Sequence, residues 1–179
     1  MRTTLFRSVC ASVMNWGWQE EANLIPSDGA ETCVGCFLRY DVALSGNTSM
    51  IGSPDAAGAG AVFVFDRRDD GTWEDVQKLT AADGENWDLF GSSVAISGDT
   101  AVIGAYRDDE RDDGSGSGYV YTKIGGKWIE NGKIVPEDDA LGVGFGYRVA
   151  ISGSTALFGA LWAGDGGSAY IVDDLFVPC

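Results

Sequence analysis

The sequence predicts an all-β fold built from repeated four-stranded antiparallel units, and three observations support this prediction. One segment recurs: FGSSVAISGDTAVIGA at residues 90–105 returns as FGYRVAISGSTALFGA at 145–160, with a weaker copy, LRYDVALSGNTSMIGS, at 38–53. Glycine-containing turn signals separate short apolar runs. No helical period is found along the chain. Such a fixed recurrence is typical of repeat architectures, in which each copy is one supersecondary unit.

The spacing of the copies is 55 residues, because three tryptophans and three aspartates align at that distance: Trp18, Trp73 and Trp128, and Asp28, Asp83 and Asp138. Within the second copy, residues 92–97 and 100–105 flank the turn signal Gly98-Asp99, which predicts a hairpin. A second hairpin is expected where residues 118–121 and 127–129 flank two glycines. Each copy therefore predicts four antiparallel strands.

Four antiparallel strands per repeat make one blade of a β-propeller, so the sequence predicts a partial β-propeller of about three four-stranded antiparallel blades. The predicted bounds are a fourth strand at 18–25, blades at 37–80 and 89–135, and an incomplete blade at 144–173. Residues 18–179 form the repeat region. Residues 1–17 are an N-terminal segment, either a degenerate strand or a leader.

The innermost strand of a blade should have two different faces. Val94 and Ile96 lie on one face, while Ser93 and Ala95 on the other face are small enough to let a neighbouring blade approach. Phe90, like its counterpart one repeat later, is expected to wedge between blades. The sequence thus predicts that consecutive blades pack face to face.

The motif FG-x-SVAISG-x-T-x-x-x-GA, followed by a loop that ends in Gly-Ser-Gly-Tyr-Val-Tyr, resembles the FG-GAP repeats of integrin-α-type β-propellers. The resemblance extends over residues 18–173. It implies a non-catalytic binding or adhesion module that presents loops on one propeller face to a protein or glycan ligand. It also implies calcium as a cofactor, and an extracellular or cell-surface location.

Charge and composition exclude several classes of function. The chain has 27 acidic and 12 basic residues, a net charge of −15, which disfavours nucleic-acid partners because phosphates would be repelled. No apolar run approaches the roughly 20 residues of a membrane helix, so direct membrane insertion is not expected. The chain has no histidine, which removes Ser-His and Cys-His catalysis. We expect no enzyme; the one alternative is a glycosidase that uses Asp83 and Asp108.

Propeller topology places the loops between strands two and three, and those between blades, on the same face. More than half of the 27 acidic residues fall in these loops. The predicted ligand-binding residues on this face are Trp87, Trp162, Asp83 and Asp88.

The richest acidic loop predicts a divalent-cation site formed by Asp108, Glu110, Asp112 and Asp113, because hard cations take several oxygen ligands. The loop departs from the calcium loops of integrin-type propellers, since Asp113 stands where a glycine should turn the chain. The family's metal loop also joins strands one and two, which are joined here by two-residue turns. A solvated acidic loop that aids solubility is the alternative.

The phase of the repeat predicts assembly. Residues 18–25 correspond to the fourth strand of a blade, and the unit at 144–173 ends after its third strand. We therefore expect a homo-oligomer, or a part of a larger complex, in which the spare strand completes a blade of another copy or another chain. A structural subunit of such an assembly is the alternative function, and a fragment of a longer propeller is the alternative explanation of the phase.

Overall fold

The computed structural model describes residues 20–27, 41–109, 114–136 and 144–175. These residues contain strands β1 (Val42–Ser45), β2 (Thr48–Ser53), β3 (Ala61–Arg67), β4 (Trp73–Leu79), β5 (Ser93–Ser97), β6 (Thr100–Ala105), β7 (Ser117–Ile124), β8 (Lys127–Ile134), β9 (Phe145–Ser152), β10 (Thr155–Ala160) and β11 (Ser168–Val172). Among the residues described, there is no helix that could cross a bilayer.

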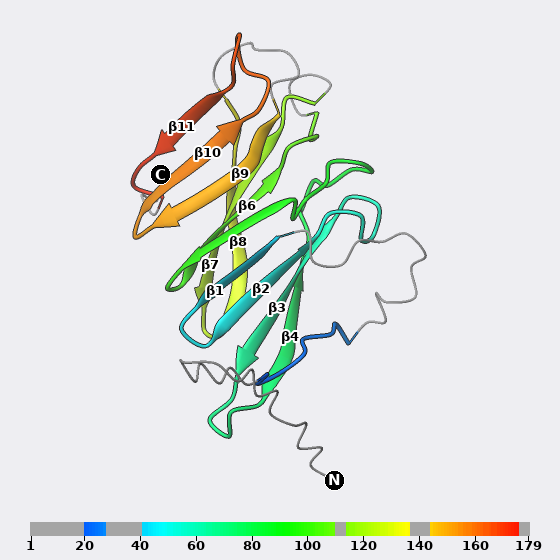
Figure 1. The fold of residues 1–179 in the computed structure, drawn as a ribbon, viewed down its shortest axis with the longest axis vertical. Coiled ribbons are helices and arrows are strands. Elements are labelled where there is room, and N and C mark those ends of the chain that lie inside the picture. Colours follow the sequence, from blue (N-terminus) through cyan, green and yellow to red (C-terminus); the bar gives the residue numbers. More distant parts are fainter. Residues whose placement is uncertain (1–19, 28–40, 110–113, 137–143, 176–179) are drawn as a thin grey trace, which may run out of the picture.

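The strands form three antiparallel sheets, which confirms the predicted all-β fold and partial propeller (Figure 1). The first sheet has the order β1-β2-β3-β4, the second β5-β6-β7-β8, and the third β9-β10-β11. Each sheet is a meander of consecutive hairpins. The glycine-containing two-residue turns join the first two strands of each sheet, as at Gly98-Asp99, where Ser97 pairs with Thr100.

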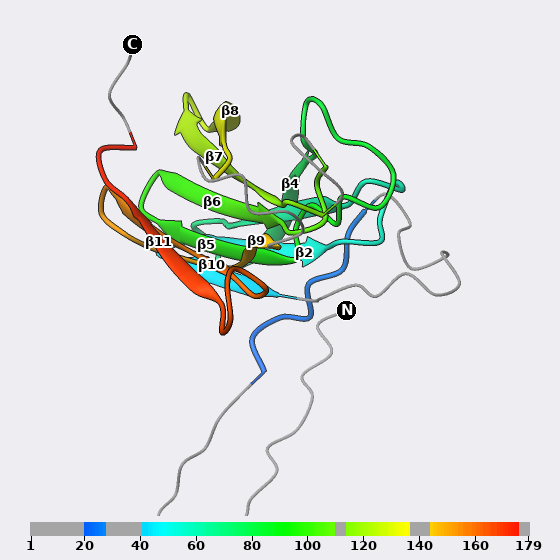
Figure 2. The same cartoon turned by 90° about the horizontal axis from the view of Figure 1, so that it is seen from above.

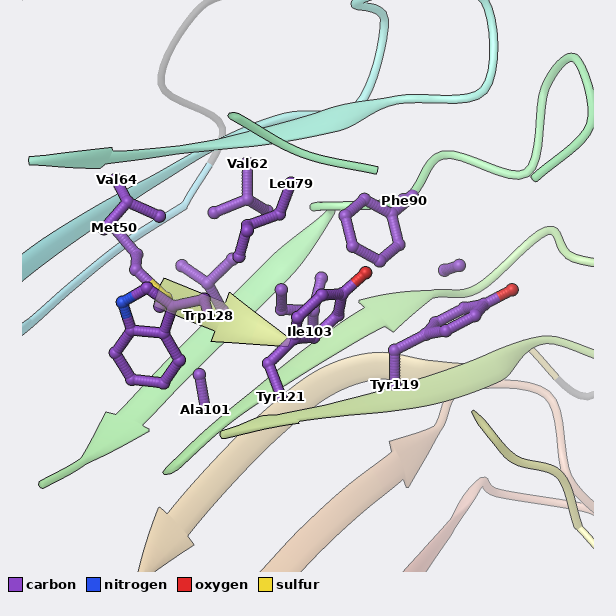
Figure 3. Close-up of a cluster of buried hydrophobic side chains, with 12 residues drawn as sticks. Met50, Val62, Val64, Leu79, Phe90, Ala101, Ile103, Tyr119, Tyr121 and Trp128 are labelled. Carbon is purple, nitrogen blue, oxygen red and sulfur yellow. The ribbon is translucent and has the colours of Figure 1, made fainter. Parts of the chain in front are cut away.

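The three sheets pack against one another through two apolar clusters, and their strands overlap when the molecule is seen from above (Figure 2). Val94 and Ile96 belong to the apolar cluster between the first and second sheets, whereas Ala95 packs in the cluster between the second and third. The predicted division of faces on this strand is therefore confirmed. Phe90 is fully buried in the first cluster, and its ring meets that of Tyr119 edge to face at 5.2 Å (Figure 3).

Glycines of the repeat set how closely the sheets approach each other. A Cβ atom on Gly52 would overlap the carbonyl oxygen of Gly91, and one on Gly104 would overlap the carbonyl oxygen of Gly146. Both pairs join consecutive sheets, so the same backbone contact recurs one repeat apart. The glycine of the motif's GA or GS ending is required because only a residue without a Cβ permits this approach.

The loops that join strands two and three lie beside the loops that join consecutive sheets, at one end of the blades. The backbone of the β4–β5 loop donates hydrogen bonds to the β2–β3 loop, and the same pattern recurs one repeat later: Trp87 N to Gly58 O (2.9 Å), Phe90 N to Ala59 O (2.9 Å), Gly144 N to Gly114 O (3.1 Å) and Phe145 N to Ser115 O (2.9 Å). We call this the loop end of the molecule.

Residues 20–27 lie against the first sheet but form no strand, since no described strand runs alongside them to form a ladder. Of the fourth strand expected at 18–25, residues 20–25 are described and are not in a strand, because a strand requires a paired neighbour, and residues 18 and 19 lie outside the described residues. Its contact is nevertheless specific: Ser27 N and Ser27 Oγ both donate to Asp75 Oδ2, at 2.8 and 2.9 Å. The N-terminal segment 1–17 lies outside the described residues.

Candidate functional site

A pocket of about 560 Å³ opens at the loop end. Its walls come from the β4–β5, β6–β7 and β10–β11 loops, which are far apart in the sequence. Three of the four predicted ligand-binding residues, Trp87, Asp88 and Trp162, line this pocket. The remaining lining residues are Asn86, Tyr106, Arg107, Asp109 and Gly114. We call this cavity the loop-end pocket.

Trp162 belongs to a group of three aromatic rings on one side of the loop-end pocket. Its ring centroid lies 6.3 Å from that of Tyr106 and 6.2 Å from that of Tyr147. The two tyrosines meet edge to face at 5.1 Å. The indole also lies against Gly144, where a Cβ atom would collide with the indole ring. Trp162 is thereby held in position while 54% of its surface stays exposed.

Trp87 lies in the same pocket with 71% of its surface exposed, a large fraction for an indole. Its backbone has φ = 79°, in the left-handed region that a side chain with a Cβ rarely adopts. The hydrogen bond from Trp87 N to Gly58 O helps to hold this conformation. Because the Trp87 indole is exposed, its strained backbone conformation does not improve packing of the core. Strained backbone of this kind is often found at binding sites.

Asp88 lines the loop-end pocket and is nevertheless buried, with 5% of its surface exposed. Its Oδ2 accepts a hydrogen bond of 2.6 Å from Glu85 N, which closes the turn before β5. Burial raises the pKa of the Asp88 carboxyl above its ordinary value, and the negative charges of Asp108 and Asp109 raise it further. This carboxylate therefore shapes the loop and adds negative potential at the pocket wall.

Asp83, the fourth predicted ligand-binding residue, does not line the loop-end pocket. It lies instead in a network with Asp108, Tyr119 and Lys133. The Tyr119 hydroxyl lies within hydrogen-bonding distance of Asp83 Oδ1 (2.9 Å) and Asp108 Oδ2 (2.7 Å), and Lys133 Nζ lies 2.7 Å from Asp83 and 3.0 Å from Asp108. The two carboxylates thus share one ammonium group and one hydroxyl.

The charges in this network are compensated. Partial burial would raise the pKa of the Asp83 carboxyl, but hydrogen bonds from Lys133 and Tyr119 hold it below its ordinary value. Burial, together with the two neighbouring carboxylates, strongly raises the pKa of the Tyr119 hydroxyl, so the phenol stays protonated. A glycosidase instead requires one carboxyl that is ready to donate a proton. The geometry supports a structural ion network between loop and sheet.

Sequence reasoning did not identify Tyr119 and Lys133, although they pair directly across β7 and β8. A signal was present: Lys133 follows Lys78 by one repeat, and a lysine near the end of a fourth strand is within reach of the acidic loops. The register that places both residues on the same face requires the bulge after Val120, which spacing alone did not indicate.

The predicted cation ligands fall largely outside the described residues, which include Asp108 but not Glu110, Asp112 or Asp113. Asp108 itself is 3% exposed and is oriented toward Tyr119 and Lys133. Within the described part of the chain, no three acidic or cysteine side chains are grouped to hold a metal ion. If Asp108 is to bind a cation, it must do so in competition with the Lys133 ammonium.

The fold and the pocket together define a class: an all-β repeat protein of propeller-type blades, with the loops between strands and between sheets gathered at one end. Comparison with known families is more specific. The model of the FG-GAP repeat matches residues 73–121 and 128–172, more than half of the chain, with each match beginning at or beside a fourth strand. The chain therefore belongs to the FG-GAP repeat family. No curated protein matches it.

FG-GAP repeats are generally found in adhesion and binding proteins, and the family is typically non-enzymatic.

Proposed function

We propose that this chain is a non-catalytic binding or adhesion module whose ligand, a protein or a glycan, is bound at the loop-end pocket. The observation that carries the proposal is the pair of exposed indoles, Trp87 and Trp162, in one cavity. Trp87 lies on a strained backbone and Trp162 packs against a glycine, yet both indoles stay exposed. Such exposure is costly for a monomeric fold and useful for a binding surface.

The chemistry of the pocket fits a ligand that combines an apolar face with polar or cationic groups. Indole faces accept the C–H side of a sugar ring or a cationic side chain. Asp109 and Arg107 supply charged hydrogen-bonding groups at the pocket wall. The buried charge of Asp88 favours hydroxyls or positive groups over anions. The net charge of −15 acts in the same direction at longer range.

Calcium assistance and an extracellular or cell-surface location are further parts of this proposal, and both rest on the family resemblance. The test for calcium is isothermal titration of the chain with CaCl₂. Heat of binding that is lost in the Asp112→Asn variant would support a site in the acidic loop. Absence of binding at millimolar calcium would contradict it, because extracellular sites of this type bind in the millimolar range or tighter.

The test of the binding site compares wild type with Trp87→Ala and Trp162→Ala on a printed glycan array and on a panel of purified extracellular matrix proteins. Both side chains are more than half exposed, so truncation leaves the fold intact. The matched control is Ile124→Ala, which removes an exposed apolar side chain at the β7–β8 turn. We expect a ligand retained by wild type and control, with affinity reduced about tenfold or more in each tryptophan variant. Equal ligand binding by all four proteins would refute the loop-end pocket as the binding site.

A structural subunit of a larger assembly is the second candidate function. The observation that favours it is that β11 is the outer strand of the third sheet among the described residues. A sheet edge with unpaired backbone groups favours pairing with another strand. In this case the loop-end pocket would serve recognition within the assembly.

A further inference from the structure

The outer face of the third sheet, formed by residues of β9, β10 and β11 on the side away from the second sheet, is an exposed copy of a buried interface. Leu157 and Ile171 on this face are 42% and 69% exposed. Their counterparts in the second sheet, Val102 and Val120, are 0% and 5% exposed because the third sheet covers them. The third sheet thus presents the same apolar surface that the second sheet uses to bind a neighbour.

The outer face of the first sheet, on the side away from the second sheet, is the complementary exposed copy. Val42 and Leu44 of β1 are 62% and 66% exposed. Their counterparts in β5, Val94 and Ile96, pack in the cluster between the first and second sheets. The two outer faces therefore match the two sides of an interface that the chain already forms twice.

A repeated hydrogen bond joins consecutive sheets at their innermost strands. The last serine of each inner strand accepts it from the turn glycine of the next sheet: Gly98 N to Ser45 Oγ (3.2 Å) and Gly153 N to Ser97 Oγ (3.1 Å). The next acceptor in this series is Ser152, on the outer face of the third sheet. The donor that precedes the series is Gly46, on the first sheet. The outer faces therefore carry a matching acceptor and donor.

Charges at the start of the inner strands are also complementary. Asp41 Oδ2 accepts hydrogen bonds from Ser93 Oγ (2.8 Å) and Val94 N (3.0 Å), and Ser93 Oγ accepts one from Val149 N (3.1 Å). The residue at the corresponding position of the third sheet is Arg148, which is exposed. If a first sheet covered the third sheet, Arg148 would meet Asp41, a pair of opposite charges.

Residues 20–27 lie where the fourth strand of a preceding blade would lie. Ser27 N donates to Asp75 Oδ2 at 2.8 Å, and one repeat later Ala82 N donates to Glu130 Oε2 at 3.1 Å. In the second case the donor follows the fourth strand of the first sheet, and the acceptor belongs to the fourth strand of the second sheet. The segment at 20–27 is thus positioned as a fourth strand on the outer face of the first sheet.

We propose that two copies of this chain close a six-bladed ring, in which the third sheet of each copy packs on the first sheet of the other. Residues 20–27 of one copy then pair with β11 of the other and complete its third blade. Leu24 corresponds to Leu79 in the repeat, and Ala169 corresponds to Val62. Because Leu79 pairs with Val62 in the first sheet, the repeat register places Leu24 opposite Ala169. Six blades lie within the four to eight of closed propellers, and two such contacts bury both outer faces.

The first test is the solution mass of the chain by light scattering and sedimentation equilibrium. We expect twice the 18.9 kDa of one chain. The Leu157→Arg variant should have the mass of one chain, because it places a charge in the new interface, while the control Ile124→Arg at the β7–β8 turn keeps the double mass. A wild-type monomer, or an assembly other than two copies, would overturn the proposal.

A second test identifies the strand exchange and does not depend on the stability of Leu157→Arg. Cysteines introduced by Leu24→Cys and Ala169→Cys should form a disulfide between copies, seen as a covalent dimer on a non-reducing gel. Each single variant is the control for the native cysteines. The double variant could have the mass of two chains and yet form no more covalent dimer than either single variant. That result would refute the exchanged strand. Glycan or protein binding at the loop-end pocket can succeed or fail independently of either result.

Discussion

Lys133→Met tests whether the network beneath the loops is an electrostatic bridge. The Lys133 ammonium lies 2.7 Å from Asp83 and 3.0 Å from Asp108, and its side chain is 17% exposed. Methionine keeps the length and most of the packing of the lysine side chain. The substitution therefore removes the positive charge and leaves two carboxylates, one of which is 4% exposed, without their shared cation.

The expected cost follows from the burial of each partner. Breaking a buried ion pair by removing one partner costs roughly 3–5 kcal/mol. We expect the lower end, about 3 kcal/mol, because Tyr119 still donates a hydrogen bond and Asp83, 45% exposed, reaches water. In a chain of this size that loss lowers the Tm by roughly 10 °C.

The pH dependence has a defined sign. The folded-state pKa of Asp83 is lowered, since the Lys133 and Tyr119 hydrogen bonds exceed the opposing effect of burial. Its stabilising contribution is therefore present above the unfolded pKa of about 3.9 and is lost as the pH falls through the lower, folded pKa. Lys133→Met removes much of this contribution. The difference in the free energy of unfolding between wild type and variant should therefore decrease below about pH 4.

Urea unfolding followed by circular dichroism measures the effect, with Lys78→Met as the matched control. Lys78 occupies the same position one repeat earlier and is exposed, so its loss should cost less than about 1 kcal/mol. The double variant Lys133→Met/Asp108→Asn should recover part of the loss, because no buried charge remains unpaired. If Lys133→Met costs no more than Lys78→Met at pH 7, the electrostatic reasoning is refuted.

Two further predictions concern stability. Asp88→Asn should stabilise the fold at pH 7, because the raised pKa of Asp88 shows that the ionised form is disfavoured; the gain should vanish below the unfolded pKa of about 3.9, and a loss at pH 7 in urea unfolding would contradict this. Gly104→Ala should cost about 1–3 kcal/mol by pushing against Gly146 of the next sheet, while Gly132→Ala, which meets no atom, should be close to neutral; equal melting temperatures of the two variants would argue against the close approach.

Much of the fold could be predicted from the sequence because the repeat contains local signals. Alternation along 93–97, the glycine turns and the 55-residue spacing each depend on neighbouring residues, so the strands and sheets followed from them. The extended segment 20–27 differed, because its repeat phase indicated a strand while pairing requires a neighbour. The repeat pattern indicates that a segment can form a strand. The backbone hydrogen bonds of a sheet form only where another strand lies beside it.

The sequence by itself determined the repeat, the two faces of each inner strand and the set of acidic and aromatic residues at the loop end. Only the tertiary structure decided which of these residues line the loop-end pocket and which belong to the ion network. It brought Trp87 and Trp162 into one pocket and placed Asp83 with Asp108, Tyr119 and Lys133. The reason is physical: loop conformation and the bulge in the β7–β8 register determine which side chains converge, and neither follows from spacing along the chain.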